Sequence, residues 1–376
     1  MRRILIVALL CCAAGPLAAQ RYWLETLYPL PYFSTADGFW LTGYYGRWSP
    51  VGFREQPEPY RAAWGINAGW STDGSYFAIV DFAAPDWWHG WRVNVTATAV
   101  RANRLGYYGL GNQTAYSTDS VDVSEHFYQV SRSTQGLRLG IQRRIAGGLR
   151  ILAGGAFTHT DYRILSGVSQ FARDAAGGVI DTAAFPLSDV VGRVGLVFDS
   201  RDHEIDPHNG LFAEALFTAG DGYQRATASA RAFVSPVERL TLAARLAGEN
   251  VTGSPPLPVL TTIESSERAI DGLGGYRSLR AYYDARFAGQ GKLIGGFEVR
   301  YALLWAPSIV EAKLVGFYEA GRVFGPGESF ALTTDGLHPS GGLELGVRLQ
   351  RNTVIVTGFA VGDDGWRFLW SSGWSF

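Results

Sequence analysis

Apolar and polar residues alternate one by one along many segments of this chain. In residues 137–142 and 343–350, leucine, isoleucine or valine fills every second position, and arginine, glutamate, glutamine or glycine fills the positions between. A period of two residues is that of a β-strand, whose successive side chains point to opposite faces, and the spacing of an amphipathic helix fits neither segment. The pattern therefore predicts strands that each have one apolar face.

The last eleven residues continue this pattern with aromatic side chains. Trp366, Phe368, Trp370, Trp374 and Phe376 fall on one face of an extended strand. Aromatic girdles at strand ends are typical of barrels in the outer membrane. A strand that ends the chain on Phe376 also resembles the C-terminal signal, here Trp370, Trp374 and Phe376, that such barrels show to their assembly machinery. We expect these rings to face lipid.

Sixteen segments carry strand signals, an even number, as an antiparallel barrel with both ends on one side requires. The strands are expected near residues 38–48, 60–70, 75–83, 91–101, 124–132, 136–145, 149–160, 190–199, 210–219, 223–234, 238–248, 292–303, 311–323, 340–350, 352–361 and 366–376. The fold class predicted is all-β, a 16-stranded antiparallel transmembrane β-barrel over residues 38–376. We expect residues 20–37 to form a short periplasmic segment and residues 249–291 to form a long extracellular loop, named loop 6. Segment 102–123 is long yet falls on the periplasmic side, which indicates either a slip in the count or a role of its own.

The first nineteen residues are organised like a secretory signal peptide. Arg2 and Arg3 precede an apolar stretch that ends near Ala14, and small residues follow at Ala18 and Ala19. The apolar stretch is too short to span a membrane as a helix, so we expect cleavage after Ala19. Both cysteines lie in this segment, and the mature chain is expected to form no disulfide bond.

Composition excludes several classes of protein. Aromatic residues make up 14% of the chain and charged residues only 18%, unlike a disordered chain. A net charge of −1 and a mean hydropathy of +0.01 argue against a nucleic-acid-binding module, which would show a basic stripe. The 6 histidines lack the spacing of metal ligands, and no GxSxG or HExxH motif occurs. We therefore expect no metal, no cofactor and no catalytic residue, and we expect that the protein is not an enzyme.

Five motifs follow one another in an order that resembles the BamA/TamA outer-membrane assembly family, also called the bacterial surface antigen family. In chain order they lie at residues 107–112, 195–210, 274–282, 295–300 and 317–321. The resemblance spans about residues 105–376, and it implies an outer-membrane barrel with a functional loop 6. Members of that family that insert barrels or secrete proteins carry N-terminal POTRA domains. None is found in this sequence, so the resemblance is to a branch that lacks POTRA domains.

The resemblance also implies a site. In that family the loop-6 arginine folds inside the barrel and pairs with acidic residues on strands 12 and 13. The corresponding loop-6 motif here is Leu279, Arg280, Ala281 and Tyr282, with Ala281 in place of the usual glycine, and the implied lumen partners are Glu298, Glu319, Phe317 and Gly321. The residues support this independently, because strand alternation points the carboxylate of Glu298 into the lumen and a guanidinium group suits two carboxylates. A purely structural role, in which the cluster fixes a loop and closes the pore, is favoured.

Two further sets of residues could be mistaken for active sites. The periplasmic-turn motif consists of Asp199, Arg201, Asp202, Pro207 and Gly210, and we interpret it as bracing the turn. Ten arginines are expected to face the lumen: Arg92, Arg138, Arg150, Arg193, Arg225, Arg231, Arg245, Arg300, Arg348 and Arg367. They could attract anions or could pair with acidic residues, and the nearly balanced total charge favours pairing.

The sequence thus predicts a component of protein or lipid translocation or assembly at the bacterial outer membrane. The expected partners are outer-membrane lipids, the barrel assembly machinery for the chain's own insertion, and a periplasmic partner protein, with no nucleic acid. The alternative is a passive pore for small anionic solutes, and an outer-membrane enzyme is the third hypothesis. An open pore would conduct steadily, whereas a barrel plugged by loop 6 would conduct little until the Arg280 contacts are lost.

Overall fold

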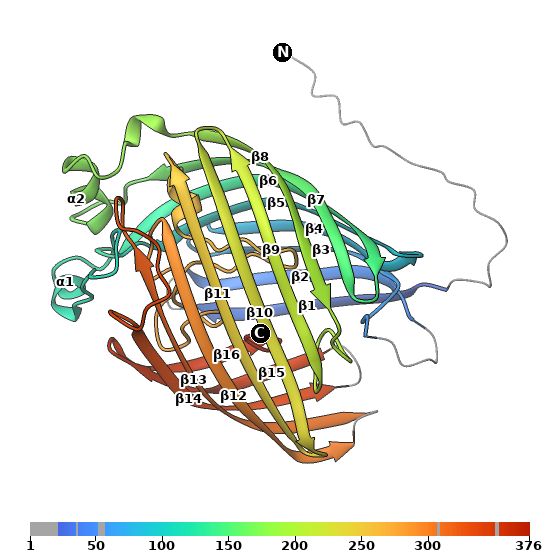
Figure 1. Cartoon of the computed structure of the whole chain (residues 1–376). Coiled ribbons are helices and arrows are strands. Elements are labelled where there is room, and N and C mark those ends of the chain that lie inside the picture. Colours follow the sequence, from blue (N-terminus) through green and yellow to red (C-terminus); the bar gives the residue numbers. More distant parts are fainter. Residues whose placement is uncertain (1–21, 35–36, 52–56, 307–308, 350–352) are drawn as a thin grey trace.

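The computed structural model describes residues 22–34, 37–51, 57–306, 309–349 and 353–376. Sixteen strands form one antiparallel sheet in which each strand pairs with its neighbours in the sequence. Figure 1 shows this sheet curled into the wall of a barrel. The predicted fold class, an all-β sixteen-stranded antiparallel barrel, is confirmed. The predicted signal peptide, residues 1–19, lies outside the described residues.

The strand bounds are β1 (Leu24–Ser34), β2 (Gly38–Ser49), β3 (Ala62–Ser71), β4 (Tyr76–Trp88), β5 (Trp91–Gly106), β6 (Gln129–Ala146), β7 (Leu149–Arg163), β8 (Leu187–Asp199), β9 (Gly210–Gly220), β10 (Tyr223–Val237), β11 (Leu240–Gly253), β12 (Gly291–Ala306), β13 (Val310–Phe324), β14 (His338–Leu349), β15 (Thr353–Gly362) and β16 (Gly365–Ser372). Four short helical segments lie between them: α1 (Thr118–Val123), α2 (Gln170–Ala176), η1 (Thr182–Ala184) and α3 (Leu257–Leu260). Within the described ranges, no helix is long and apolar enough to cross a membrane.

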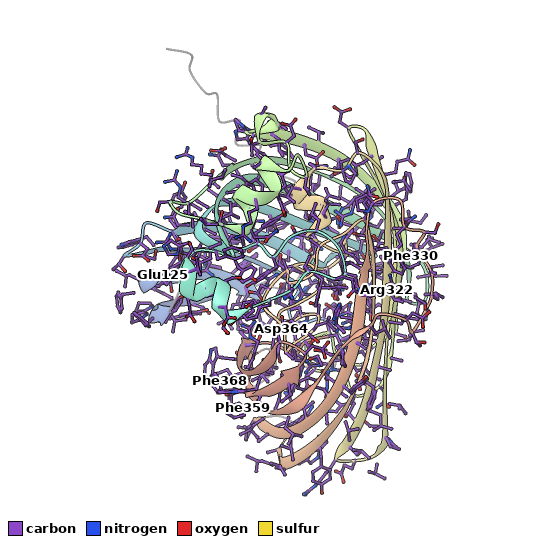
Figure 2. All side chains as sticks on the ribbon, turned by 90° about the vertical axis from the view of Figure 1, so that its left-hand side faces the viewer. Glu125, Arg322, Phe330, Phe359, Asp364 and Phe368 are labelled. Carbon is purple, nitrogen blue, oxygen red and sulfur yellow. The ribbon has the colours of Figure 1, made fainter. Side chains whose placement is uncertain are left out.

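Side chains along each strand alternate between the lumen and the outer face, as the sequence pattern predicts. On β10, Arg225 and Thr227 are buried toward the lumen, whereas Ala226 is exposed on the outer face. On the outer face of β15 and β16, the rings of Phe359 and Phe368 lie 5.4 Å apart, and both are 56% exposed (Figure 2). Large apolar side chains exposed on the outer face are what a wall in contact with lipid requires.

The two ends of the barrel carry connections of different length. The long connections follow β5, β7, β11 and β13, so they lie at one end, named here the loop end; they span residues 107–128, 164–186, 254–290 and 325–337. The connections after the even-numbered strands lie at the opposite end, named the turn end; most are short, and the two longest span residues 50–61 and 200–209. Connection 254–290 is loop 6, somewhat shorter than the 249–291 predicted.

Two strand predictions are wrong, and the two errors cancel in the count. Residues 24–34, predicted to precede the barrel, form β1, so the barrel wall begins there rather than at residue 38. The strands predicted at 124–132 and 136–145 are one strand, β6, because its pairing with β5 continues without a break through Gly136. With β1 counted, connection 107–128 falls at the loop end with the other long connections, and the conflict at 102–123 disappears.

The first and last strands are the two ends of the sheet. Along the described parts of the chain, β1 pairs with β2 alone and β16 with β15 alone. The place where β1 and β16 face each other is named the seam. The wall is therefore held together everywhere by strand pairing except at the seam.

Loop 6 folds back into the barrel and packs against its inner wall. Leu273, Leu279 and Phe287 of this loop are at most 1% exposed and form one core with Ile294 of β12 and Phe317 of β13. Burial of these side chains removes apolar surface from water and holds the loop in the lumen. The candidate site lies at this contact.

Candidate functional site

Arg280 of loop 6 meets three carboxylates inside the barrel. Its Nη2 donates to Glu298 on β12, its Nη1 donates to Glu344 on β14 at 2.8 Å, and its Nε donates to Glu319 on β13 at 3.3 Å. The backbone N–H of Arg280 also donates to Glu319. All four side chains are at most 2% exposed. These four residues are named the arginine lock, because they join loop 6 to three neighbouring strands.

The charges of the lock are balanced by two further arginines. Arg300 donates to the second oxygen of Glu298 at 2.7 Å, and Arg245 lies 3.5 Å from Glu319. Burial by itself would lower the pKa of Arg280, but the surrounding carboxylates hold that pKa above its ordinary value. Three guanidinium groups thus face three carboxylates, and Arg280 stays charged although it is buried.

Local backbone geometry presents Arg280 to the wall. Gly274 has a φ of +117°, and a Cβ there would lie 2.1 Å from the carbonyl oxygen of Tyr283, so only glycine fits. The hydroxyl of Ser278 donates to the carbonyl of Gly274 at 2.8 Å and closes the turn. Arg245 then donates to the carbonyl oxygens of Arg277 and Ser278, which ties this turn to β11.

The other residues of the predicted loop-6 motif line the same contact. Leu279 is fully buried in the core of loop 6. The backbone N–H of Ala281 donates to the hydroxyl of Ser340 at 3.0 Å, and the hydroxyl of Tyr282 donates to the carbonyl of Pro339 at 2.9 Å. The motif therefore reaches the start of β14 as well as β12 and β13.

Of the two other predicted partners on β13, Phe317 contacts Arg280 and Gly321 does not. The ring of Phe317 lies 3.7 Å from the guanidinium carbon of Arg280, a cation–π contact. Gly321 pairs with Ile294 of β12, and a Cβ on Gly321 would lie 2.8 Å from the carbonyl oxygen of Leu293. The structure brings Phe317 to Arg280, but along the described chain Gly321 serves the close approach of two strands and makes no contact with Arg280.

Glu344 was missed as a partner of Arg280. The signal that could have found it is the alternation over 343–350, which places Glu344 and Arg348 together on the face opposite Leu343 and Leu345. A buried carboxylate on the lumen face of the next strand needs a cation. Arg280 supplies that cation.

A second set of ion pairs holds the far end of loop 6. Glu264 pairs with Arg138 on β6 and with Arg193 on β8, the latter at 3.0 Å. Glu267 pairs with Arg201, beyond the end of β8, at 2.7 Å. Burial opposes ionisation of Glu267, but the arginines beside it hold its pKa well below its usual range. Loop 6 is thus fastened to opposite sides of the wall.

The predicted turn motif braces the connection between β8 and β9. Arg201 donates from Nε and Nη2 to Asp199, each at 3.0 Å, and Asp202 accepts from the backbone N–H groups at 208 and 209. Gly210 has a φ of +115°, and a Cβ there would lie 2.4 Å from the carbonyl of residue 200. Pro207 lies within this turn, before the segment that Asp202 caps. The same turn holds Glu267, so it also anchors loop 6.

A buried cluster at the turn end has the outline of a metal site. Ligand atoms of Asp206, His208 and Glu311 lie within 4.8 Å of one another. The ammonium of Lys313 already occupies their centre, at 2.7 Å from Asp206, 3.1 Å from His208 and 3.0 Å from Glu311. Burial opposes ionisation of Asp206, but Lys313 and His208 hold its pKa at about 2. The donor set therefore fits a salt-bridge cluster around a lysine.

The prediction that Trp374 and Phe376 share the outer face with Trp370 is wrong. Trp370 is 69% exposed on the outer face, but Phe376 is only 8% exposed. The strand ends at Ser372, and Gly373 has a φ of +93°, a conformation that reverses the chain and turns the last residues into the lumen.

Polar and cationic groups hold this C-terminal tail in the lumen. The indole Nε1 of Trp374 donates to Asp206 at 2.8 Å. Arg300 donates to the carbonyl oxygen of Phe376 at 3.0 Å, and Arg245 lies 4.6 Å from the centre of its ring. Because Arg300 and Arg245 also contact the arginine lock, the tail and loop 6 share two arginines.

Nine of the ten predicted lumen arginines make ion pairs with acidic residues: Arg92, Arg138, Arg150, Arg193, Arg225, Arg231, Arg245, Arg300 and Arg348. The tenth, Arg367, lies 4.1 Å from the ring centre of Tyr283. Among the described residues, nine of these ten guanidinium groups are therefore neutralised by acidic partners, which weakens the attraction of the interior for anions.

Comparison with known proteins extends these findings. No match was found among curated proteins. The structure of BamA from Haemophilus ducreyi lacking POTRA domains 1–3 aligns over 94% of this chain and 69% of its own, with a TM-score of 0.57 and 11% identity. CdiB from Escherichia coli aligns over 95% of this chain and 61% of its own, with a TM-score of 0.53 and 12% identity. At these identities the likeness is one of fold, and this chain spans less than two thirds of CdiB.

Sixteen antiparallel strands in one curled sheet, with loop 6 packed against the inner wall, define a β-barrel protein. Residues 63–353 match the Omp85 superfamily domain. This match covers well over half of the chain, which therefore belongs to the Omp85 superfamily. The resemblance to the BamA/TamA family, stated from five sequence motifs, is confirmed.

Proposed function

We propose that this protein acts in the translocation or assembly of protein or lipid at the outer membrane, with loop 6 as a releasable brace of the lumen. The observation that carries the proposal is the arginine lock, in which one loop residue is joined to three adjacent strands. Loss of one residue would free a whole side of loop 6. The unpaired seam supports the same proposal, because a wall with one unpaired joint deforms there first.

The alternative, a passive pore for small anionic solutes, is less well supported. Such a pore gains its selectivity from free cations along the lumen. Here nine of the ten predicted lumen arginines are neutralised by acidic partners, and loop 6 packs against the inner faces of β11, β12 and β13.

We also propose that the protein is not an enzyme. Nδ1 of His159 and Oγ of Ser188 lie 2.9 Å apart, but on the exposed outer wall between β7 and β8. A serine nucleophile needs a base that a third group orients, as well as donors for the oxyanion. Among the described residues, no carboxylate contacts His159. Purified wild type and Ser188→Ala should therefore both fail to hydrolyse phospholipid or peptide.

The proposed partners follow from the proposed role. The barrel would reach the membrane through the barrel assembly machinery, after the predicted signal peptide has taken it across the inner membrane. A periplasmic partner would meet the turn end, where Asp202 and its neighbours form a braced surface. Outer-membrane lipids contact the exposed outer wall.

Deletion followed by complementation tests the proposal. A deletion strain should show an altered profile of outer-membrane proteins or surface lipids, measured by quantitative proteomics and lipid analysis. Wild type should restore the profile and Arg280→Ala should not. The matched control is Arg163→Ala, because Arg163 forms an exposed ion pair with Asp161 of its own strand, β7, away from loop 6. A strain with unchanged proteins and lipids but slower uptake of small anions would instead establish the pore.

A further inference from the structure

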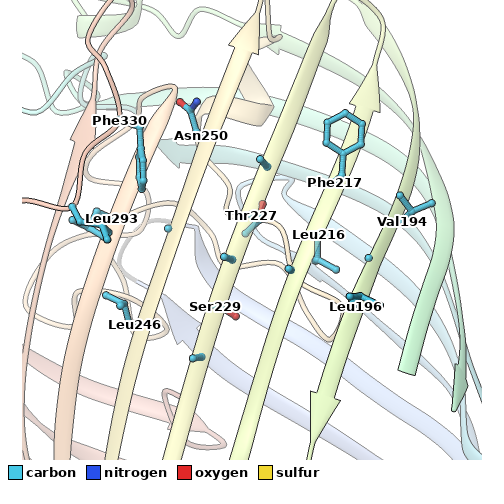
Figure 3. A pocket seen from close by; sticks show the side chains of 17 residues that line it. Val194, Leu196, Leu216, Phe217, Thr227, Ser229, Leu246, Asn250, Leu293 and Phe330 are labelled. Carbon is cyan, nitrogen blue, oxygen red and sulfur yellow. The ribbon is translucent and has the colours of Figure 1, made fainter. Parts of the chain in front are cut away.

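An apolar groove runs along the outer wall of the barrel over β8 to β11 (Figure 3). Its volume is about 830 Å³, within the usual range of small-molecule sites. The groove faces away from loop 6 and from the arginine lock. It is therefore separate from the candidate site described above.

The floor of the groove is made of small side chains in register across three strands. Ala228 on β10 pairs with Ala215 on β9 and with Gly248 on β11. Ala226 and Ala230, two residues before and two residues after Ala228 on the same face of β10, continue the floor. From Ala226 to Ala230 the floor is about 13 Å long, given the rise of a strand.

Larger apolar side chains form the two sides. Leu196 and Phe217 stand on one side and are 50% and 45% exposed. On the other side, Leu246 is 52% exposed, while Leu293 is only 6% exposed although it points outward. Leu293 is buried because connection 325–337 folds over the outer wall at this point.

That connection forms a partial roof. Phe330 lies against the groove, and a Cβ added to Gly248 would come within 2.9 Å of its ring, so glycine leaves room for the ring (Figure 3). Leu332 lies beside Phe330 and is 77% exposed. Figure 2 places Phe330 at the edge of the barrel, next to Arg322. A hollow with a floor, two sides and a roof holds a chain more firmly than a smooth wall does, because more of the chain's surface is covered.

We propose that this groove binds one acyl chain of a phospholipid with a zwitterionic headgroup. The groove is continuous with the exposed apolar wall that meets lipid, so acyl chains are the apolar ligands available to it. The proposal depends on the membrane location of the barrel and is independent of the proposed function.

The charges at the loop end of the groove select the headgroup. Gln224 lies two residues before Ala226, toward the loop end, and pairs with Thr252; both side chains are neutral and polar. Arg322 of β13 is paired with Glu328 of the roof, and Asp221, in the turn between β9 and β10, is exposed. Among these described residues an anionic headgroup finds no unpaired cation, whereas the carboxylate of Asp221 can attract the ammonium of phosphatidylethanolamine.

Native mass spectrometry of the barrel in mild detergent tests the proposal, with phosphatidylethanolamine as the probe. Wild type should retain one lipid. Ala228→Phe fills the floor and should retain at least about tenfold less, because excluding two methylene groups already costs that factor. The matched control is Ala232→Phe, on the same strand and face but outside the groove, which should retain lipid as wild type does.

A second variant and two further lipids complete the test. Phe330→Ala opens the roof without touching the strands, and it should also lower retention. Phosphatidylglycerol and lipid A, offered in parallel, should be retained less than phosphatidylethanolamine. Equal lipid retention by wild type and Ala228→Phe, or no retention by wild type, would overturn the proposal that the groove binds an acyl chain. Equal retention of all three lipids would overturn the headgroup assignment.

Discussion

At the scale of single residues, the protein depends on arginines that each serve several acidic partners. Arg280 contacts Glu298, Glu319 and Glu344 at once, because each nitrogen of its planar guanidinium group meets a different carboxylate. Removal of Arg280 would leave Glu344 without an ion-pair partner among the described residues, while Glu298 and Glu319 would each keep one arginine. The value of Arg280 therefore lies in the three carboxylates that it neutralises.

Arg280→Ala should lower the free energy of unfolding by about 3–5 kcal/mol, the usual cost of breaking a buried ion pair. Arg47→Ala is the matched control, because Arg47 pairs with Glu25 on the outer face, where the two side chains are 40% and 58% exposed. An exposed pair contributes at most about 1 kcal/mol, so the control should change little. Urea unfolding of the refolded barrels measures both, and equal losses would contradict the account of the lock.

Asp206 gives a prediction for pH. Its pKa is lowered from 3.8 to about 2, so its stabilising effect is complete above pH 3.8 and is lost as the pH falls through 2. Wild type should be more stable than Asp206→Asn by a constant amount from pH 7 down to about 4. That difference should then shrink toward pH 2. Thermal unfolding at a series of pH values measures it, and a difference that disappears near neutral pH would be evidence against a charged Asp206.

At the scale of elements, the alternation of apolar and polar residues predicted most strands. It failed for strands that do not have one apolar and one polar face. The sixteen segments counted from alternation left β1 out; it has apolar residues on both faces and two prolines, features that suit an edge strand. β6 was divided because its first half carries polar residues on both faces. No local pattern marks the inward turn of the C-terminal tail, since it depends on Arg300 and Asp206, which are distant in sequence.

The candidate site, like the strands, was predicted in part. The motif resemblance identified Arg280 and its neighbours on β12 and β13 because each lies in a short local pattern. Glu344 and the far anchors Glu264 and Glu267 lie outside those patterns. Their roles depend on where a connection of 37 residues, 254–290, folds within the lumen, and such a path is set by tertiary contacts that alternation does not encode.

The free edge of β1 explains why the seam is unpaired. Thr42 of β2 donates to the carbonyl of Leu30 at 2.6 Å, so the backbone polar groups of Leu30 point toward β2. Neighbouring residues in a strand point the other way, and Pro29 and Pro31 therefore turn their nitrogens to the free edge. Proline has no N–H to donate, so two consecutive donors are absent from that edge.

Restoring those donors should let the seam close. In Pro29→Val/Pro31→Val, β1 can pair with β16, and cysteines placed at Leu27 on β1 and Phe368 on β16 should form a disulfide bond more readily. Non-reducing electrophoresis after mild oxidation measures the yield, with the same cysteine pair in the proline-containing chain as the control. If both chains give the same yield, the prolines do not keep the seam apart.

At the scale of the whole molecule, loop 6 joins opposite sides of an otherwise simple barrel. Its acidic end is bound by arginines of β6, β8 and the turn after β8, and its basic end is bound by glutamates of β12, β13 and β14. The C-terminal tail adds a third contact through the arginines next to the lock. The central claim is that these ion pairs keep loop 6 in the lumen and that Arg280 is the residue that releases it.

Conductance of the refolded barrel in a planar bilayer tests this claim most directly. Wild type should conduct little, and both Arg280→Ala and the double variant Glu298→Gln/Glu319→Gln should conduct steadily, because each releases the basic end of loop 6 from the wall. Arg163→Ala, which breaks an exposed ion pair with Asp161 on the same strand, should remain like wild type. If wild type is already a stable, anion-selective pore and the variants match it, loop 6 is not a plug held by the arginine lock, and the protein is a passive pore.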